Sequence, residues 1–113
     1  MPCLDISTNV NLEGVDVDSF FREATTAVAT ITGKPEKSVM VVLKGSRTIT
    51  LRENKEPAAL GEVLLSIGSI NSEAKSELIS SISSILDNHF SIPRDRFFLK
   101  VYDNSLATRL SRM

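Results

Sequence analysis

Two segments of the chain follow one pattern: Pro35-Glu36-Lys37-Ser38-Val39-Met40-Val41-Val42-Leu43-Lys44 and Pro93-Arg94-Asp95-Arg96-Phe97-Phe98-Leu99-Lys100-Val101-Tyr102. In each, a proline stands four residues before a run of apolar and β-branched residues, which predicts a strand. The proline follows a predicted helix in both cases, and that helix follows another predicted strand. The chain therefore reads as two β-α-β units of similar length.

The first unit begins with an alternating segment, Pro2 to Thr8, which predicts a strand. Asp16 or Asp18 offers a cap for a helix, and Gly33 ends it in the left-handed conformation. The apolar positions of this helix recur at spacings of three and four: Val17, Phe20, Phe21, Ala24, Val28 and Ile31. The strand Val39 to Lys44 is apolar on both faces, as in a strand that is buried on both sides.

The second unit is less regular at its start. Arg47 to Leu51 alternates and predicts a short strand or edge, whereas Ala58 to Gly68 fits both strand and helix spacing. Asn71 or Ser72 caps a second helix, and its intervening serines predict a polar, solvated face. The last strand is Phe97 to Tyr102.

These elements predict a single α+β domain over residues 1–113, with a short tail at 104–113. Two β-α-β units form a four-stranded mixed sheet with both helices on one face. The other face has no helix to cover it, although two of its strands are apolar there. Self-association is the economical way to cover it.

Composition excludes several classes of protein. The chain has 13 Lys+Arg against 14 Asp+Glu, so it lacks the basic excess of a nucleic-acid-binding domain. Its longest apolar run, Val39 to Leu43, is far shorter than a membrane helix, and no leader pattern opens it. Cys3 is the single cysteine and His89 the single histidine, which argues against a disulfide framework, a metal site or a cofactor. We therefore expect a soluble intracellular domain, with Cys3 as a small buried hydrophobe and His89 at the core edge.

Pro2 is the residue that suggests chemistry. Removal of Met1 would leave a secondary amine, and an apolar pocket would lower its basicity because burial disfavours the charged form. Such an amine can serve near neutral pH as a general base or as a nucleophile. On its own a Met-Pro start is a weak signal.

The order of several short motifs resembles the macrophage migration inhibitory factor (MIF) and D-dopachrome tautomerase family over residues 2–103. The plant-type members are the most similar. The residues that carry the resemblance are Pro2-Cys3-Leu4, Ser7-Thr8-Asn9-Val10, Thr32-Gly33-Lys34-Pro35, Glu56-Pro57, Ser66-Ile67-Gly68 and Arg96 through Asp103.

This resemblance implies a homotrimer with active sites between neighbouring subunits and no cofactor. It implies Pro2 as the catalytic base, Lys34 as the holder of a substrate carboxylate and Ile67 as a pocket wall. The last strand of a neighbouring subunit would contribute Phe98 and Lys100 to substrate binding.

Phe98 and Lys100 depart from the family pattern, which has a tyrosine and an asparagine at these positions. Phe98 keeps an aromatic wall without the hydroxyl, and Lys100 replaces a neutral amide with a cation. The family's Cys-x-x-Cys is also absent, since Ala58-Ala59-Leu60-Gly61 takes its place. Loss of a general acid or polar clamp reduces a rate by one to several powers of ten.

Three hypotheses remain open. The favoured one is a MIF-like homotrimer with a weak or lost phenylpyruvate and dopachrome-type tautomerase site, and with a signalling or binding role through a cytokine-receptor-like protein. The alternative is an active tautomerase of a small aromatic keto acid that uses Pro2. The third is a structural ferredoxin-like domain, against which the joint presence of Pro2 and Lys34 counts.

The C-terminal residues Ser111-Arg112-Met113 follow the small–basic–apolar pattern of a peroxisomal address. We therefore expect recognition by the peroxisomal import receptor, with a further cytoplasmic pool. No nucleic-acid or membrane partner is expected.

Overall fold

The computed structural model describes residues 1–65 and 70–102. Along the chain they form β1 (Cys3–Thr8), α1 (Val17–Thr32), η1 (Glu36–Ser38), β2 (Met40–Lys44), β3 (Ala59–Leu64), α2 (Ser72–Phe90), η2 (Arg94–Arg96) and β4 (Phe97–Tyr102). The two predicted β-α-β units are confirmed as β1-α1-β2 and β3-α2-β4. In both units the proline precedes a short 3-10 turn that leads into the strand.

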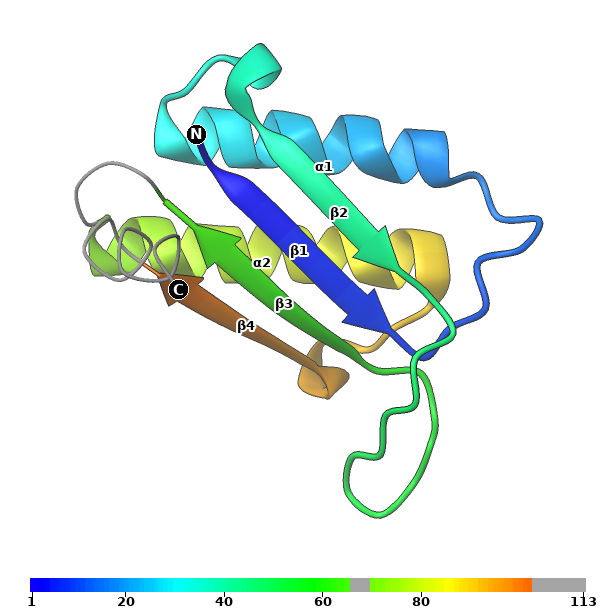
Figure 1. Ribbon diagram of the computed structural model, residues 1–113. Coiled ribbons are helices and arrows are strands. Elements are labelled where there is room, and N and C mark those ends of the chain that lie inside the picture. The colour runs from blue at the N-terminus through cyan, green and yellow to red at the C-terminus, as the bar shows by residue number, and fades with distance from the viewer. Residues whose placement is uncertain (66–69, 103–113) are drawn as a thin grey trace, which may run out of the picture.

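The four strands form one mixed sheet in the order β2-β1-β3-β4. β1 and β2 are parallel, β3 and β4 are parallel, and the two units meet through the antiparallel pair β1 and β3. Figure 1 shows both helices behind the sheet, on one of its faces. The predicted fold class is therefore confirmed.

The helix ends form where the sequence predicts them. The Asp16 carboxylate accepts a hydrogen bond from the Ser19 N–H at 3.2 Å, and Gly33 ends α1 with a φ of 72°. The Asn71 side chain accepts one from the Ala74 N–H at 2.7 Å. α2 ends at Ser91, which adopts a left-handed φ of 54°, two residues before Pro93.

The core lies between the sheet and the two helices. Alternate residues of the central strands and one stripe of each helix are fully buried there, among them Leu4, Ile6, Val63, Phe20, Val28, Leu78 and Ile82. Each such side chain contributes roughly 1.5–3 kcal/mol when removed from water. Because these side chains point toward the helices, the alternate residues of each strand point to the opposite face of the sheet. No helix among the described residues is both long and apolar enough to span a membrane.

Two local predictions need correction. Residues 47–50 form no strand within this part of the chain: the Arg47 N–H donates to the Thr8 carbonyl at 3.0 Å, and then only a bridge between Leu51 and Asn54 follows. Alternation alone did not suffice, because β1 ends at Thr8 and no strand among the described residues pairs with residues 48–50. Ser83 was expected on a polar helix face, but it is buried and its hydroxyl lacks a hydrogen-bond partner within the described chain.

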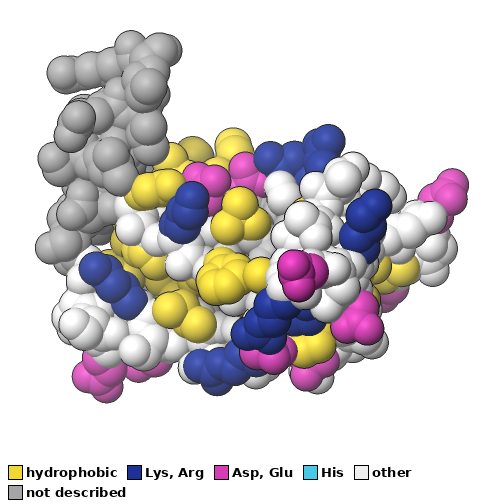
Figure 2. Space-filling model, turned by 90° about the horizontal axis from the view of Figure 1, so that it is seen from below, with side chains coloured by type: hydrophobic (Ala, Val, Ile, Leu, Met, Phe, Trp, Pro, Cys, Tyr) yellow, Lys and Arg dark blue, Asp and Glu magenta, His cyan; other side chains and the backbone are white. Residues whose placement is uncertain are grey.

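The face of the sheet away from the helices, here called the open face, is mixed in character. Met40, Leu60 and Phe98 are exposed hydrophobic residues on it. A charged row crosses the same face, because Asp5 lies level with Glu62, and Glu62 with Lys100. The expectation of strands that are apolar on both sides is therefore wrong for β4. The expected burial of β2 on both sides is also wrong, because Met40 is exposed and the other residues of β2 are only partly buried. Figure 2 looks at the molecule from below, so the open face is seen edge-on; hydrophobic side chains gather in the middle and left part of this view, with Lys and Arg side chains around them.

Candidate functional site

Pro2 is buried at the entrance to β1, at the end of the sheet where β2 also begins. Its carbonyl accepts a hydrogen bond from the Met40 N–H at 2.9 Å, which ties the start of the chain to β2. Figure 1 shows the N-terminus beside the segment that leads from α1 into β2. The register thus places Pro2 at a fixed point of the fold.

Lys34 lies in that connecting segment. It follows the left-handed Gly33, and its backbone N–H donates to the Ala29 carbonyl at 3.1 Å. The Lys34 residue is partly exposed. Met40 lies only six residues after Lys34, and its N–H binds the Pro2 carbonyl. The structure therefore brings Lys34 and Pro2, two of the predicted site residues, to the same end of the sheet. The third predicted residue, Ile67, lies outside the described residues.

Phe98 and Lys100 lie elsewhere in the same chain. Phe98 is level with Leu60, which is level with Ser7, five positions along β1 from Pro2. At about 3.3 Å per residue this separates Phe98 from Pro2 by roughly 16 Å along the strands, and β3 lies between. Lys100 is level with Asp5, roughly 10 Å along. One chain therefore does not bring these residues to Pro2.

Cys3 directly follows Pro2, so its burial shows how far this end of β1 is shielded from water. It is half-buried on the open face rather than fully buried as expected. Burial raises the pKa of the Cys3 thiol, and the nearby Asp5 carboxylate raises it further. The Lys44 ammonium binds Asp5 at 3.1 Å. The thiol is therefore held in its neutral, unreactive form, in agreement with the expectation that Cys3 is not a nucleophile.

His89 lies at the core edge, as expected. Its Nε2 lies 2.7 Å from a carboxylate oxygen of Glu23, so it links α2 to α1. Its ring contacts Phe20 and Phe90 edge-on or tilted. This is the setting of a structural histidine that joins two helices.

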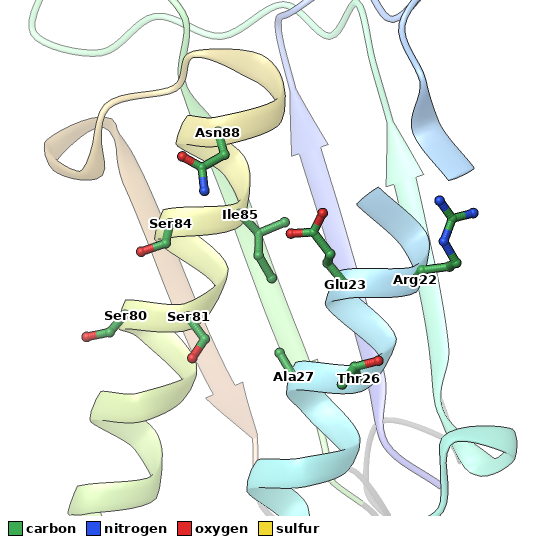
Figure 3. Close-up of a pocket in the computed structure, with 9 residues that line it drawn as sticks. All are labelled: Arg22, Glu23, Thr26, Ala27, Ser80, Ser81, Ser84, Ile85 and Asn88. Carbon is green, nitrogen blue, oxygen red and sulfur yellow. The ribbon is translucent and has the colours of Figure 1, made fainter. Parts of the chain in front are cut away.

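A groove of about 660 Å³ runs between α1 and α2 on the side away from the sheet. Figure 3 shows Ser80, Ser81 and Ser84 along the α2 wall, so the predicted polar face is confirmed there. Arg22 hydrogen-bonds Ser19 in α1, and Glu23 binds His89. The groove therefore offers mainly hydroxyl groups and no evident catalytic pair.

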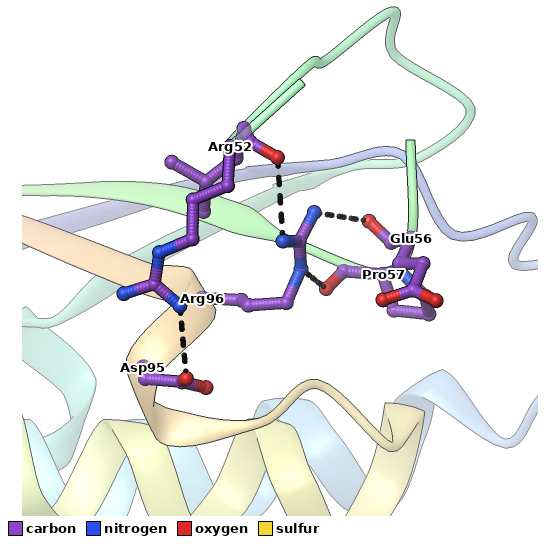
Figure 4. Close-up of polar contacts among 6 residues, drawn as sticks. Arg52, Glu56, Pro57, Asp95 and Arg96 are labelled. Atoms are coloured by element: carbon purple, nitrogen blue, oxygen red, sulfur yellow. Dashed lines mark hydrogen bonds and ion pairs between the residues drawn. The ribbon is translucent and has the colours of Figure 1, made fainter. Parts of the chain in front are cut away.

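A second hollow of about 480 Å³ was not predicted from the sequence. Arg47 and Arg96 line it, together with the apolar side chains Leu60 and Phe98, and we call it the arginine hollow. Arg96 is 6 % exposed and donates to the carbonyls of Pro57, Glu56 and Leu51 at 2.9, 3.0 and 3.4 Å (Figure 4). One sequence signal could have indicated this hollow. Arg96 directly precedes an apolar strand, and a residue in that position is buried together with the strand.

No group of three or more His, Cys, Asp or Glu side chains within residues 1–65 and 70–102 is arranged to hold a metal ion.

A family model described as macrophage migration inhibitory factor (MIF) matches residues 1–109. The MIF homolog of Trichuris trichiura is 32 % identical over 103 residues, which covers 91 % of this chain and 89 % of the relative. The rat MIF is 29 % identical over 107 residues, covering 95 % of this chain and 91 % of the relative. The closer likeness to plant-type members stays a prediction.

Solved structures agree with the fold. The crystal structure of the MIF homologue from Prochlorococcus marinus aligns with a TM-score of 0.80 at 27 % identity, over 88 % of this chain and 85 % of that one. The MIF of Trichinella spiralis also gives a TM-score of 0.80, at 22 % identity over 89 % and 88 % of the two chains, which supports the fold alone. With the family model covering nearly its whole length, this chain belongs to the macrophage migration inhibitory factor family.

Proposed function

We propose that this protein is a homotrimeric MIF-family protein whose site between subunits has weak or no activity as a phenylpyruvate and dopachrome-type tautomerase. Its proposed main role is to bind a small aromatic keto acid or a protein receptor. The observation that carries the proposal is the placement of Phe98 and Lys100, which are exposed on β4 and lie away from Pro2 in their own chain.

Desolvation acts on an amine in the opposite direction from a thiol. Burial raises the pKa of Cys3 because it disfavours the thiolate. The same physical effect would disfavour the ammonium form of a Pro2 amine once Met1 is removed. Asp5 would favour that ammonium, but its carboxylate is bound by Lys44 at 3.1 Å. A neutral amine at Pro2 can therefore act as a base near neutral pH.

A second copy of the chain is needed to complete this site. Phe98 and Lys100 are exposed on β4 and lie away from Pro2 in their own chain. The alternating segment 47–50 also lacks a partner strand within the described chain. An edge without a partner can pair with another chain. These features support the trimer that the family resemblance implies.

In the proposed reaction, the Pro2 amine removes a proton from the carbon beside the keto group of the substrate. The electron pair of that C–H bond forms the C=C bond of an enolate. A proton from water then adds to the oxygen to give the enol, and the Pro2 ammonium returns its proton to water. Lys34 would bind the substrate carboxylate and orient it. Phe98 offers an aromatic wall but no hydroxyl, so this site lacks one donor for the developing oxygen charge.

The test uses the protein after Met1 removal, verified by mass spectrometry. Enol formation from phenylpyruvate is followed beside a Pro2→Gly variant, and ligand binding is measured separately. We expect slow turnover that disappears in Pro2→Gly. Equal turnover in both proteins would show that Pro2 is not the base, and rapid turnover in the parent would favour the alternative, an active tautomerase.

A further inference from the structure

We propose that the groove between α1 and α2, here called the helix groove, binds a neutral sugar ring. One chain forms this groove, and Pro2 and Lys34 are not among its lining residues. Both helices lie on the face of the sheet opposite to the open face (Figure 1). Neighbouring chains that cover the open face would therefore leave the helix groove accessible to a ligand.

The floor of the helix groove is apolar and small. Figure 3 shows Ala27 of α1 and Ile85 of α2 between the two helices, with Glu23 and Asn88 toward one end. Ile85 is 8 % exposed and belongs to the core, and Ala27 packs against that core. The alanine leaves room that a longer side chain would fill. The resulting volume of about 660 Å³ is in the range of sites for small molecules.

Four neutral polar side chains around this floor make no hydrogen bond to any described residue. They are Thr26 on α1 and Ser81, Ser84 and Asn88 on α2. A hydroxyl group can both donate and accept hydrogen bonds, and a side-chain amide offers two donors and an acceptor. Because these groups come from both helices, one ligand can bind both walls. Hydroxyl groups on the ligand match them, since each can likewise donate and accept.

The charged residues of the helix groove argue against an ionic ligand. Arg22 and Glu23 carry opposite charges at consecutive positions. The Arg22 guanidinium donates to the Ser19 hydroxyl at 3.0 Å, and the Glu23 carboxylate lies 2.7 Å from Nε2 of His89. An anion would be repelled by Glu23 and a cation by Arg22. A sugar ring is uncharged, carries hydroxyl groups around its edge, and has C–H groups on its faces that can cover the apolar floor.

The test is an NMR titration of the full-length protein with methyl β-D-glucopyranoside. The methyl signals of Ala27 and Ile85 report the helix groove, and that of Met40 reports the open face. Glycerol, which has hydroxyl groups but no ring, is the control ligand. We expect the glucoside to shift the signals of Ala27 and Ile85 with a millimolar dissociation constant, and glycerol to leave them unchanged. Pro2→Gly should not alter this binding, because Pro2 lies outside the groove.

Ser81→Ala combined with Ser84→Ala removes two of the unpaired hydroxyl groups. We expect this double change to weaken glucoside binding about tenfold, because two neutral hydrogen bonds to the ligand are lost. Ser72→Ala combined with Ser76→Ala is the matched control. It removes two exposed hydroxyl groups from the same helix outside the groove. The control should leave the dissociation constant within about twofold of the parent value.

Several outcomes would overturn the proposal. One is the absence of shifts at Ala27 and Ile85 with tens of millimolar glucoside, and another is an equal response to glycerol. Equal weakening by the two double changes would show that the groove hydroxyl groups do not hold the ligand. Tighter binding of methyl β-D-glucuronide, which adds a carboxylate to the same ring, would show that the groove selects an anion. Shifts at Met40 alone would place the sugar on the open face instead.

Discussion

Single side chains determine what chemistry this member of the MIF family can perform. Pro2 and Lys34 lie at one end of the sheet, where burial also raises the pKa of Cys3. Phe98 and Lys100 instead lie on the open face of β4, where both are exposed. In the proposed trimer, chemistry at Pro2 would therefore depend on what a neighbouring chain presents to it.

Restoring the two polar partners should raise the activity. We expect Phe98→Tyr combined with Lys100→Asn to increase phenylpyruvate turnover by about tenfold or more, because a hydroxyl and a neutral amide would again stabilise the developing enolate. Initial rates of the processed proteins measure this. Pro2→Gly in the same background is the control and should abolish the gain. An unchanged rate would place the loss of activity outside Phe98 and Lys100.

Residue motifs predicted the positions of Pro2 and Lys34 but not the arginine hollow. Gly33 ends α1 and Pro35 prevents the helix from continuing, so this local pattern was enough to predict the position of Lys34 between them. Arg47 and Arg96 are 49 residues apart in the chain and line one hollow only because β1, β3 and β4 are adjacent. The position of Arg96 before an apolar strand could indicate that it is buried, but not which groups surround it, because its carbonyl partners lie in a loop 39–45 residues away.

Secondary-structure elements were predicted well wherever local signals agreed. The caps Asp16, Gly33 and Asn71 lie where the sequence places them. The ambiguous segment 58–68 became the strand Ala59–Leu64 because β1 and β4 lie on either side of it. Residues 47–50 have the same alternation but no neighbouring strand in the described chain. An alternating sequence therefore formed a strand only where a neighbouring strand was available to hydrogen-bond with it.

The cap of α1 should make stability depend on pH. The pKa of Asp16 is lowered, mainly by the hydrogen bond from the Ser19 N–H and then by the Ser19 side chain. A lowered pKa in the folded state means that stability is present above the unfolded pKa, near 3.8, and is lost as pH falls through the folded value. Asp16→Asn keeps a cap without a charge, so its melting temperature should fall less between pH 6 and pH 2.

Asp18→Asn is the comparison for that measurement. It removes a carboxylate from the same turn without the contact to Ser19. Its melting temperature should follow the parent more closely over the same pH range. Parallel curves for Asp16→Asn and the parent would contradict the role given to the cap.

The link between η2 and the loop at 51–57 depends on Arg96. Arg96→Lys keeps the charge but loses the planar fork, and we expect it to lower the free energy of unfolding by about 1–3 kcal/mol as carbonyls lose their donors. Urea denaturation measures this. Arg52→Lys, which alters the exposed pair with Asp95, should change it by less than about 1 kcal/mol. Equal effects would mean that burial of Arg96 adds nothing.

At the scale of the whole molecule, assembly decides whether the proposed site exists. Light scattering should give about three times the 12.4 kDa of one chain. Met40→Lys with Leu60→Lys should shift the protein to smaller species, because both residues are exposed hydrophobics of the open face. Thr30→Lys, on an exposed position of α1, is the control and should leave the mass unchanged. A monomeric parent at micromolar concentration would remove the proposed site between subunits.

The last prediction concerns location. It depends on Ser111, Arg112 and Met113, which lie outside the described residues. The small–basic–apolar order matches the peroxisomal address if Met113 carries the free carboxylate, and methionine is a weaker terminal residue than leucine in the simplest form of the motif. We therefore propose import into peroxisomes that is incomplete and leaves a cytoplasmic pool.

A fluorescent reporter that ends in the last ten residues should give punctate signal that coincides with a peroxisomal marker. The matched control changes Arg112 to Glu, which reverses the charge of the central residue and should make the signal diffuse. Import of both reporters would show that the terminal triplet is not what is read. Diffuse signal from the unchanged reporter and from the full-length protein would contradict the proposal and leave the cytoplasm as the proposed location.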